Sequence, residues 1–462
     1  MSRADSSVQT HQTGSAVRNT KTYGSTRVSR ALIDFLQAEA AGGIIMMGAA
    51  VLALVVANSA MAGAYDNFWH RYAGLSAGGW ALELSLHHWV NDGLMAIFFF
   101  LVGLEIKREL LFGELASPRR AALPVIAAAG GAIVPALVYV AFNAGGAYAQ
   151  GWGVPMATDI AFAVTVLALL GSRAPLWLKS FVTALAIADD IMAVLVIAIF
   201  YSGALDLAAI AWATGCAFVL AGLNLGRVMR PAPYVLVGIL MWYFVLQSGI
   251  HATIAGVVTA AFIPASLGRA AERLRDSALE VRGLAGELTH AEEPREAWEV
   301  VDEREAELED IVQAVISQSA PLYRLEHAIH PWSAFVILPI FAFANAGIEV
   351  SLSGLGSTLA TPLALGVMLG LFVGKQVGIT GAAWLAVRLG AGSLPLGARW
   401  SQIWGGAALA GIGFTMSIFI AALAFPDPHT LQVAKLAVVV GSLASAAAGI
   451  LLLSLVSRPE DS

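Results

Sequence analysis

Two adjacent aspartates interrupt a long apolar stretch of the sequence. Asp189 and Asp190 lie near the middle of residues 177–201, with apolar residues on both sides. Neighbouring residues of a helix point about 100° apart, so the two carboxylates cannot face one cavity equally. We expect one to line an aqueous funnel and the other to meet a neighbouring helix. Such acids can bind protons or cations in turn. The alternative, an acid pair buried for packing alone, is disfavoured because two adjacent charges in apolar surroundings are costly.

A second apolar stretch contains Thr158 and Asp159, three and four residues after Pro155. Proline followed by such a pair is typical of a helix N-terminus, here in the middle of an apolar segment. We therefore expect a broken helix, with Thr158 or Asp159 facing the positive end of its second half. The alternative is a span that begins at residue 160, but residues 160–171 are too short to cross a bilayer alone.

Lys375 lies in the middle of the apolar residues 361–386. A buried lysine must pair with an acid or lose its proton, and the aspartates above are its expected partners. Gly374-Lys375 is not a phosphate-binding loop, because the upstream glycines and the following Ser or Thr are missing. Further along, Gly411 and Gly413 indicate either close helix packing or a second helix break.

The composition places these charges in a membrane protein. Only 13% of the residues are charged and 58% are hydrophobic, with a mean hydropathy of +0.75. Soluble domains carry about 25% charged residues, and a larger core cannot compensate, since single cores stop growing at roughly 250–300 residues. The net charge of -6 and the absence of a basic stripe argue against a nucleic-acid partner. The single cysteine, Cys216, excludes an intrachain disulfide and is expected to be a buried thiol.

Twelve apolar segments are candidate membrane spans. They cover residues 40–58, 89–106, 121–143, 155–171, 177–201, 205–223, 234–248, 251–265, 331–348, 361–386, 402–425 and 430–456. Lys and Arg concentrate in the N-terminal segment and the even-numbered loops, a pattern that requires the short seventh and eighth segments to be separate and predicts both termini in the cytoplasm. The fourth span then enters from outside and the eleventh from inside, as in an inverted-repeat transporter. The predicted fold is an all-α membrane protein of about twelve transmembrane helices, with inverted repeats and two broken, crossing helices, spans 4 and 11.

The segments outside the spans complete the predicted organisation. Residues 1–30 are predicted to form a disordered cytoplasmic tail without a signal peptide. Spans 1–8 occupy residues 31–265, a charged cytoplasmic insert occupies 266–320, spans 9–12 occupy 321–456, and 457–462 form a short cytoplasmic tail. The insert has apolar residues at roughly helical spacing, so we expect a solvated helical segment, with a regulatory or partner-binding role as the alternative.

From about residue 31 to 456 the sequence resembles the NhaA-type sodium–proton antiporters. The inverted-repeat rule was drawn in part from this family and is not independent support for the resemblance. The matching segments are Trp89-Val90-Asn91-Asp92-Gly93-Leu94-Met95-Ala96, Leu101-Val102-Gly103-Leu104-Glu105-Ile106-Lys107-Arg108-Glu109-Leu110, Ala157-Thr158-Asp159-Ile160-Ala161-Phe162-Ala163, Ala188-Asp189-Asp190, His251-Ala252-Thr253, Phe341-Ala342-Phe343-Ala344-Asn345-Ala346-Gly347 and Gly411-Ile412-Gly413-Phe414-Thr415-Met416-Ser417.

The resemblance implies roles for individual residues. Asp189 and Asp190 match the acids that bind Na+ or Li+, Thr158 and Asp159 lie where the broken helices cross, and Lys375 matches the lysine that pairs with the first acid. Asp92 matches a further membrane acid that faces the cavity or the partner repeat. Six residues match a cytoplasmic charge cluster that the family ties to pH response: Glu105, Arg108, Glu109, Glu326, His327 and His330. The alternative is that they form a charged rim that sets the topology. His251 matches a histidine at the outer start of the eighth span, where a helix-end histidine in a polar patch is the alternative.

Three features depart from the family pattern. The 266–320 insert is long, and Met192 stands near the acids where a smaller residue is expected. The loop from Asp66 to Trp80 corresponds to the dimer-forming hairpin of the family but matches it poorly. These departures affect the expected pH set point and ion preference more than the exchange chemistry.

The implied function is a secondary antiporter, not an enzyme, in a bacterial inner membrane. It would exchange cytoplasmic Na+ or Li+ for external protons without a cofactor, with two protons per sodium and activation at alkaline pH. A homodimer in membrane lipid is also implied. An intramembrane aspartyl protease would need its two acids on separate spans, and a cation channel would need a repeated filter. A sodium-coupled symporter would need a midplane cluster suited to an organic solute, and no such cluster is visible in the sequence.

Overall fold

The computed structural model describes residues 25–77, 80–265, 320–351, 354–394 and 397–456. Most of the predicted tail (1–30) and insert (266–320) and all of the predicted C-terminal tail (457–462) lie outside these ranges. Helix α1 begins at Ser25, so the last residues of the predicted disordered tail belong to a helix.

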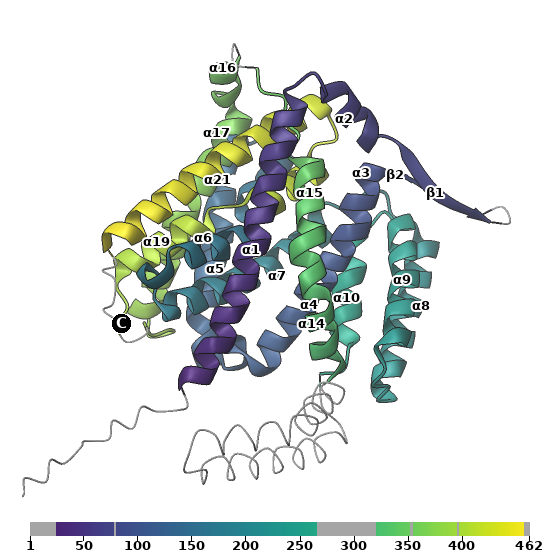
Figure 1. Cartoon of the computed structure of the whole chain (residues 1–462), viewed down its shortest axis with the longest axis horizontal. Coiled ribbons are helices and arrows are strands. Elements are labelled where there is room, and N and C mark those ends of the chain that lie inside the picture. Colours follow the sequence, from purple (N-terminus) through teal and green to yellow (C-terminus); the bar gives the residue numbers. More distant parts are fainter. Residues whose placement is uncertain (1–24, 78–79, 266–319, 352–353, 395–396, 457–462) are drawn as a thin grey trace, which may run out of the picture.

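Helices make up nearly all of the described chain (Figure 1). In its first half they are α1 (Ser25–Ala57), α2 (Ala62–Trp69), α3 (Leu86–His88), α4 (Met95–Phe112), α5 (Pro118–Asn143), α6 (Ile160–Leu169), α7 (Leu176–Phe200), α8 (Leu207–Leu225), α9 (Pro231–Gln247) and α10 (Thr253–Phe262). In its second half they are α14 (Pro321–Trp332), α15 (Leu338–Asn345), α16 (Leu355–Leu359), α17 (Pro362–Leu369), α18 (Lys375–Arg388), α19 (Trp400–Ala410), α20 (Phe414–Ala424) and α21 (Pro428–Val456).

Short stretches of different helical pitch join several of these helices. Three have the tighter 3-10 geometry: η2 (Glu114–Ala116), η3 (Ala149–Met156) and η4 (Gly171–Arg173). Three have the wider π geometry: η1 (Trp89–Leu94), η5 (Ser333–Ile337) and η6 (Gly370–Gly374). Wider turns of this kind occur often at functional sites. Here η1 contains Asp92, and η6 ends directly before Lys375.

One β-hairpin departs from the predicted all-α fold. Strands β1 (Tyr72–Ala77) and β2 (Trp80–Ser85) pair antiparallel, with Gly74 opposite Glu83. The hairpin projects from the upper side of the helices in Figure 1, opposite the start of α1.

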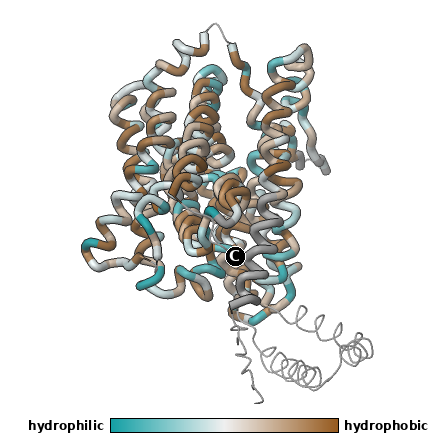
Figure 2. Tube along the Cα trace, turned by 60° about the vertical axis from the view of Figure 1, so that its left-hand side comes forward, coloured by the Kyte–Doolittle hydropathy of each residue, from teal (hydrophilic) through white to brown (hydrophobic). Residues whose placement is uncertain are grey.

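Eight helical segments among the described residues are long and apolar enough to cross a membrane: Leu86–Phe112, Pro118–Asn143, Ala149–Leu169, Leu176–Phe200, Leu207–Leu225, Pro321–Asn345, Pro362–Arg388 and Pro428–Val456. Two pairs meet the criterion only jointly: Ala41–Ala57 with Ala62–Trp69, bent by 117°, and α19 with α20, bent by 46°. Helices α9 and α10 are apolar but shorter. Each segment predicted as a span overlaps one of these helices, while the total of twelve stays a prediction. Figure 2 shows apolar residues along most helices and hydrophilic residues mainly near loops.

The two helix breaks have local causes in the sequence. Residues 157–159 are not helical, and the Asp159 side chain caps α6 by accepting a hydrogen bond from the Phe162 N–H. The other break spans Gly411 to Gly413, between α19 and α20. The breaks lie against each other, because the Asp159 N–H donates to the Ile412 carbonyl at 2.7 Å. A Cβ on Gly413 would lie 2.9 Å from the Ala157 carbonyl oxygen, so glycine allows this approach.

Close packing of α5 and α18 holds the part of the chain that carries Lys375. A Cβ at Gly130 would meet the Gly378 carbonyl oxygen at 2.3 Å, and one at Gly378 would meet the Gly130 carbonyl oxygen at 2.2 Å. The two backbones therefore touch one turn beyond Lys375. Contact of this kind through small residues is how membrane helices approach without a hydrophobic driving force.

Replacing Gly413 by alanine is expected to destabilise the protein by about 1–3 kcal/mol, because the added methyl group overpacks the junction of the two breaks. Gly381→Ala is the matched control. Gly381 lies in α18, and a Cβ added there would have no neighbouring atom within 4 Å, so helix propensity should leave stability unchanged or raised by up to about 1 kcal/mol. Thermal unfolding in detergent measures both. Equal melting temperatures for Gly413→Ala and the unmodified protein would contradict the packing at this break.

Candidate ion-binding site

A buried ion pair joins α7 to α18. The Lys375 Nζ lies 2.8 Å from Asp189 Oδ2, and the side chains are 0% and 1% exposed. Lys375 also donates to Thr158 Oγ1 at 2.9 Å, and the Thr158 hydroxyl donates to the Ala410 carbonyl at 2.8 Å. Ala410 is the last residue of α19, so this chain of hydrogen bonds connects the ammonium to the negative end of that half-helix.

The Asp159 carboxylate compensates the positive, N-terminal ends of two half-helices, α6 and α20. Its Oδ1 accepts from the Phe162 N–H at 3.0 Å, in the first turn of α6. Its Oδ2 accepts from the Thr415 N–H at 2.9 Å and from the Thr415 hydroxyl at 2.5 Å, in the first turn of α20. One carboxylate thus binds the N-terminal donors of two half-helices, the ends that carry partial positive charge.

Asp190 is buried, yet one of its oxygens has no partner. Its Oδ1 accepts no hydrogen bond, and neither does Oδ1 of Asp189 nor the hydroxyl of Ser417. Buried polar atoms in folded proteins are nearly always paired, so each exception needs an explanation. A buried carboxylate oxygen without a hydrogen-bond partner can accept a proton or a hard monovalent cation.

A small cavity lies beside Asp190. Its volume is about 60 Å³, enough for a few water molecules. Asp190, Asp159 and Thr415 line one part of it, and Glu105, His330 and Ser333 line another. The cavity therefore connects the acids of α6 and α7 to two of the residues that the sequence predicted for pH response.

The other predicted pH-response residues lie apart from this cavity. Arg108 Nε is 2.9 Å from Glu326 Oε1, and Arg108 Nη1 is 4.0 Å from Glu109 Oε2. Glu109 Oε1 accepts from the Glu114 N–H at 2.6 Å, beyond the end of α4. His327 is exposed and its Nδ1 lies 3.0 Å from the Tyr323 carbonyl of its own helix. The predicted cluster is thus divided between a charge network, the cavity wall and an exposed histidine.

Asp92 and His251 do not join the ion pair or the cavity. They lie close enough to each other for their charges to interact, and His88 is also near Asp92. His251 Nε2 is 2.7 Å from the Tyr201 carbonyl, and the Asp92 carbonyl accepts from Trp242 Nε1 at 2.8 Å. Asp92 therefore faces a different part of the structure from the one that holds Asp189 and Asp190.

Two further residues were not predicted from the sequence as part of the site or as buried charges: Thr415 and Lys435. Thr415 stood in a matched motif but received no role, although a hydroxyl residue in the first turn after a glycine break is a usable signal. Lys435 was overlooked as an intramembrane charge, although it lies within the apolar residues 430–456 and is only 6% exposed. Both signals were in the sequence, but the partner of Thr415, Asp159, comes from a distant segment.

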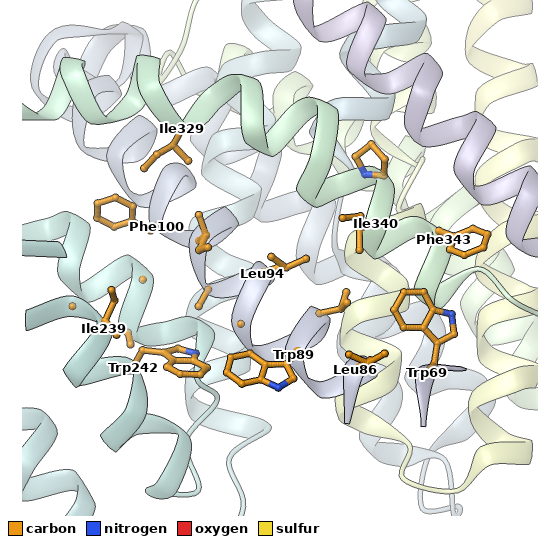
Figure 3. Close-up of a pocket in the computed structure, with 18 of the residues that line it drawn as sticks. Trp69, Leu86, Trp89, Leu94, Phe100, Ile239, Trp242, Ile329, Ile340 and Phe343 are labelled. Atoms are coloured by element: carbon orange, nitrogen blue, oxygen red, sulfur yellow. The ribbon is translucent and has the colours of Figure 1, made fainter. Parts of the chain in front are cut away.

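A much larger cavity of about 1060 Å³ lies between α9 and α10 on one side and α1 and α15 on the other. Figure 3 shows its apolar wall, including Trp69, Trp89, Trp242 and Phe343. Trp89 and Trp242 stack with ring centroids 5.9 Å apart. No titratable side chain lines this cavity, so it offers no chemistry for ion exchange.

The chain is similar to known proteins over most of its length. Residues 33–453 match the sequence model of the family described as Na+/H+ antiporter 1. Proteins named Na(+)/H(+) antiporter NhaA are 47% identical in Oleidesulfovibrio alaskensis (92% of this chain, 93% of the relative), 48% in Acidithiobacillus ferrooxidans (92% and 97%) and 48% in Caulobacter vibrioides (92% and 91%). The chain belongs to this family of sodium–proton antiporters. It is a multi-pass membrane protein and a secondary transporter that exchanges sodium for protons, not an enzyme.

A double-mutant cycle tests the ion pair. Asp189→Asn and Lys375→Met should each destabilise the protein by about 3–5 kcal/mol, because each leaves one buried charge without its partner. The combined variant should recover most of this loss, since both charges are then absent. Thermal unfolding of the four proteins in detergent provides the measurement. Losses that simply add in the double variant would show that the two side chains do not stabilise each other.

Proposed function

We propose that the exchange takes place at Asp189 and Asp190, which bind Na+ or Li+ in competition with protons. The observation that carries this proposal is that Oδ1 of each aspartate lacks a hydrogen-bond partner and that Asp190 lines a water-sized cavity. Sodium prefers oxygen ligands, and carboxylates, hydroxyls and carbonyls are all within reach of this junction. The ion is the cargo, and the proposal includes no cofactor. Thr158 and Asp159 position the breaks around the site, and Lys375 holds Asp189 while no ion is bound.

The proposed stoichiometry is two protons for each sodium, which makes the cycle electrogenic. Asp190 carries one proton. The second is carried either by Asp189 or by Lys375, which becomes neutral when the ion takes its partner. The ion pair at 2.8 Å supports the second alternative for the state described by the structure. Because adjacent groups of this kind titrate as one unit, the two protons belong to the site rather than to fixed residues.

Activity is proposed to rise as the cytoplasm becomes alkaline. Protons and sodium compete for the same oxygens, so a lower proton concentration favours ion binding. Glu105 and His330 line the cavity toward the ion site, and the network of Arg108, Glu109 and Glu326 lies nearby at the end of α4. We propose that these charges, with His327 and His251, adjust the pH at which the site loads sodium.

The proposed topology has twelve spans, inverted repeats and both termini in the cytoplasm of a cell with an inner membrane. The two breaks, in η3–α6 and α19–α20, are the proposed crossing of spans 4 and 11. Their mutual hydrogen bonds and their compensation by Asp159 and Lys375 support this arrangement. Alternating access would then move one set of helices relative to the other around the site, a mechanism described for this same family.

The proposed partners are membrane lipid and a second copy of the chain, with no nucleic acid. The large cavity lined by apolar side chains is suited to lipid acyl chains, and its tryptophans are residues that favour the membrane interface. The projecting β-hairpin offers a strand edge that a second copy could extend.

Replacing Asp190 by asparagine should abolish exchange, since the amide cannot release a proton. Everted membrane vesicles with an acid interior and a trapped pH dye provide the assay, with added sodium raising the internal pH in the unmodified protein. Asp66→Asn is the control, because the Asp66 side chain is 73% exposed and lies outside the site. Sodium-triggered alkalinisation that persists in Asp190→Asn, at equal protein abundance, would contradict the proposed site.

The proposed effect of the cytoplasmic charges on the pH profile can be tested at the ion pair of Arg108 and Glu326, by neutralising one partner at a time. Glu326→Gln removes a negative charge, weakens proton binding at the site and should shift the pH of half-maximal activity downward by about half a unit. Arg108→Gln removes a positive charge and should shift it upward by a similar amount. The pH dependence of exchange in vesicles measures both. Unshifted profiles for both variants would favour the charged-rim interpretation of this cluster.

A further inference from the structure

Gln376 follows Lys375 in α18, and both ends of its side-chain amide are hydrogen-bonded. The residue is only 8% exposed. Its Nε2 donates to the Phe372 carbonyl at 2.8 Å, and its Oε1 accepts from Trp404 Nε1 at 2.7 Å. Because an indole N–H can only donate, Trp404 fixes which end of the amide faces which partner. The Gln376 amide therefore joins α19 to the helical turn that precedes Lys375.

That turn is η6, the π-helical segment in which Phe372 lies. The Lys375 N–H donates to the carbonyl of Gly370, whereas in an α-helix it would donate to that of Leu371. The Leu371 carbonyl instead accepts from the Ser445 hydroxyl at 3.4 Å. Each residue takes up about 100° of an α-helical turn, so the extra residue in η6 changes the direction in which the Lys375 side chain points relative to α17.

The π turn packs against two prolines of neighbouring segments. A Cβ on Gly374 would lie 2.7 Å from Pro135 Cα, and one on Gly370 would lie 2.6 Å from Pro155 Cβ. The two glycines therefore bring the turn into close contact with α5 and η3. Gln376 adds a hydrogen-bonded contact to a third neighbour, α19. A turn that is held by packing on two neighbours is thus tied by a polar side chain to another.

Lys375 and Gln376 connect α18 to α19 at two neighbouring positions. Lys375 reaches the last residue of α19 through Thr158, whose hydroxyl donates to the Ala410 carbonyl at 2.8 Å. Gln376 reaches Trp404, which lies earlier in the same helix. A buried ion pair offsets its desolvation cost only when its geometry is excellent. The ion pair of Lys375 therefore depends on the contacts that fix the rotation of α18 at this point.

We propose that Gln376 is a positioning residue for Lys375: it ties the π turn to α19 and so holds the ammonium in the direction of Asp189. The proposal rests on the function proposed above, in which an arriving cation displaces Lys375 from Asp189. Gln376 binds no ion in this role. It acts on sodium binding through the strength of the ion pair.

Loosening this tie should let sodium compete more easily. A lysine that is less well directed holds Asp189 less strongly, so a lower sodium concentration displaces it at a given pH. The pH of half-maximal activity should fall for the same reason, because sodium then competes better with the protons of the site. General damage to the packing would instead lower the maximal rate without raising the apparent sodium affinity, and this difference separates positioning from a structural role.

The test titrates sodium at several pH values in everted vesicles that contain one variant each. Gln376→Met keeps the length of the side chain, removes both hydrogen bonds and should lower the half-saturating sodium concentration on the order of fivefold, as expected within one hydrogen-bond network. Trp404→Phe removes only the indole donor and should give a smaller change in the same direction. Trp384→Phe is the matched control and should change nothing, because Trp384 is 47% exposed, compared with 48% for Trp404, and contacts the Arg388 guanidinium instead.

A double-mutant cycle shows whether the effect passes through Lys375. In thermal unfolding, Gln376→Met should destabilise the unmodified protein more than it destabilises Lys375→Met, because part of its effect is the weakened ion pair. This comparison requires no ion binding, so its result does not depend on where exchange takes place. If Gln376→Met fails to accumulate in membranes, Trp404→Phe, a milder change at a half-exposed side chain, decides the same question in both experiments.

Two results would overturn the role of Gln376. One is an unchanged half-saturating sodium concentration in both Gln376→Met and Trp404→Phe, because Gln376 would then be only a structural tie between α18 and α19. The other is a pair of stability losses that simply add when Gln376→Met is combined with Lys375→Met. Unchanged exchange in Asp190→Asn would instead overturn the function proposed for the ion site, while non-additive stabilities would still show that Gln376 supports Lys375.

Discussion

A lysine ammonium and three carboxylates are buried where water cannot solvate them, and the chain itself supplies the compensation. The ion pair of Lys375 with Asp189 is the centre of this arrangement. It requires α18 to approach α5 through facing glycines, and it requires Thr158 to connect the ammonium to the end of α19. Asp159 provides the opposite charge for the starts of α6 and α20. The helix breaks, which would otherwise expose unpaired backbone groups in lipid, are stabilised by the same side chains that form the site.

At the proposed site this arrangement accounts for reversible exchange. Asp189 is satisfied by Lys375 while no ion is bound, whereas Asp190 keeps an unpaired oxygen beside a small cavity. A cation that arrives there has to displace a proton or the lysine, so the two cargoes exclude each other without any large change in the site. Glu105 and His330 line the same cavity as Asp190.

Much of this site was visible in the sequence, because charged residues in apolar segments are rare and each one demands a partner. Asp189, Asp190, Asp159 and Lys375 were found in this way, and Pro155 and the glycines at 411 and 413 indicated the helix breaks. Contacts between distant segments were not visible. The division of the predicted pH-response residues between cavity and surface, the donation of Thr415 to Asp159 and the separation of Asp92 from the site all depend on tertiary packing. The π-helical turn before Lys375 and the hairpin were also not predicted, because hydrophobic periodicity distinguishes helices from strands but does not indicate such local changes in backbone geometry.

The central claim is that sodium and protons compete for Asp189 and Asp190, and calorimetry of sodium binding to the purified protein tests it most directly. Titrations in buffers of different ionisation enthalpy give the number of protons released for each sodium bound. The account predicts a release of about two protons per sodium from this coupled site, and no sodium binding in Asp190→Asn. Sodium binding without proton release, or equal binding in Asp190→Asn, would contradict it.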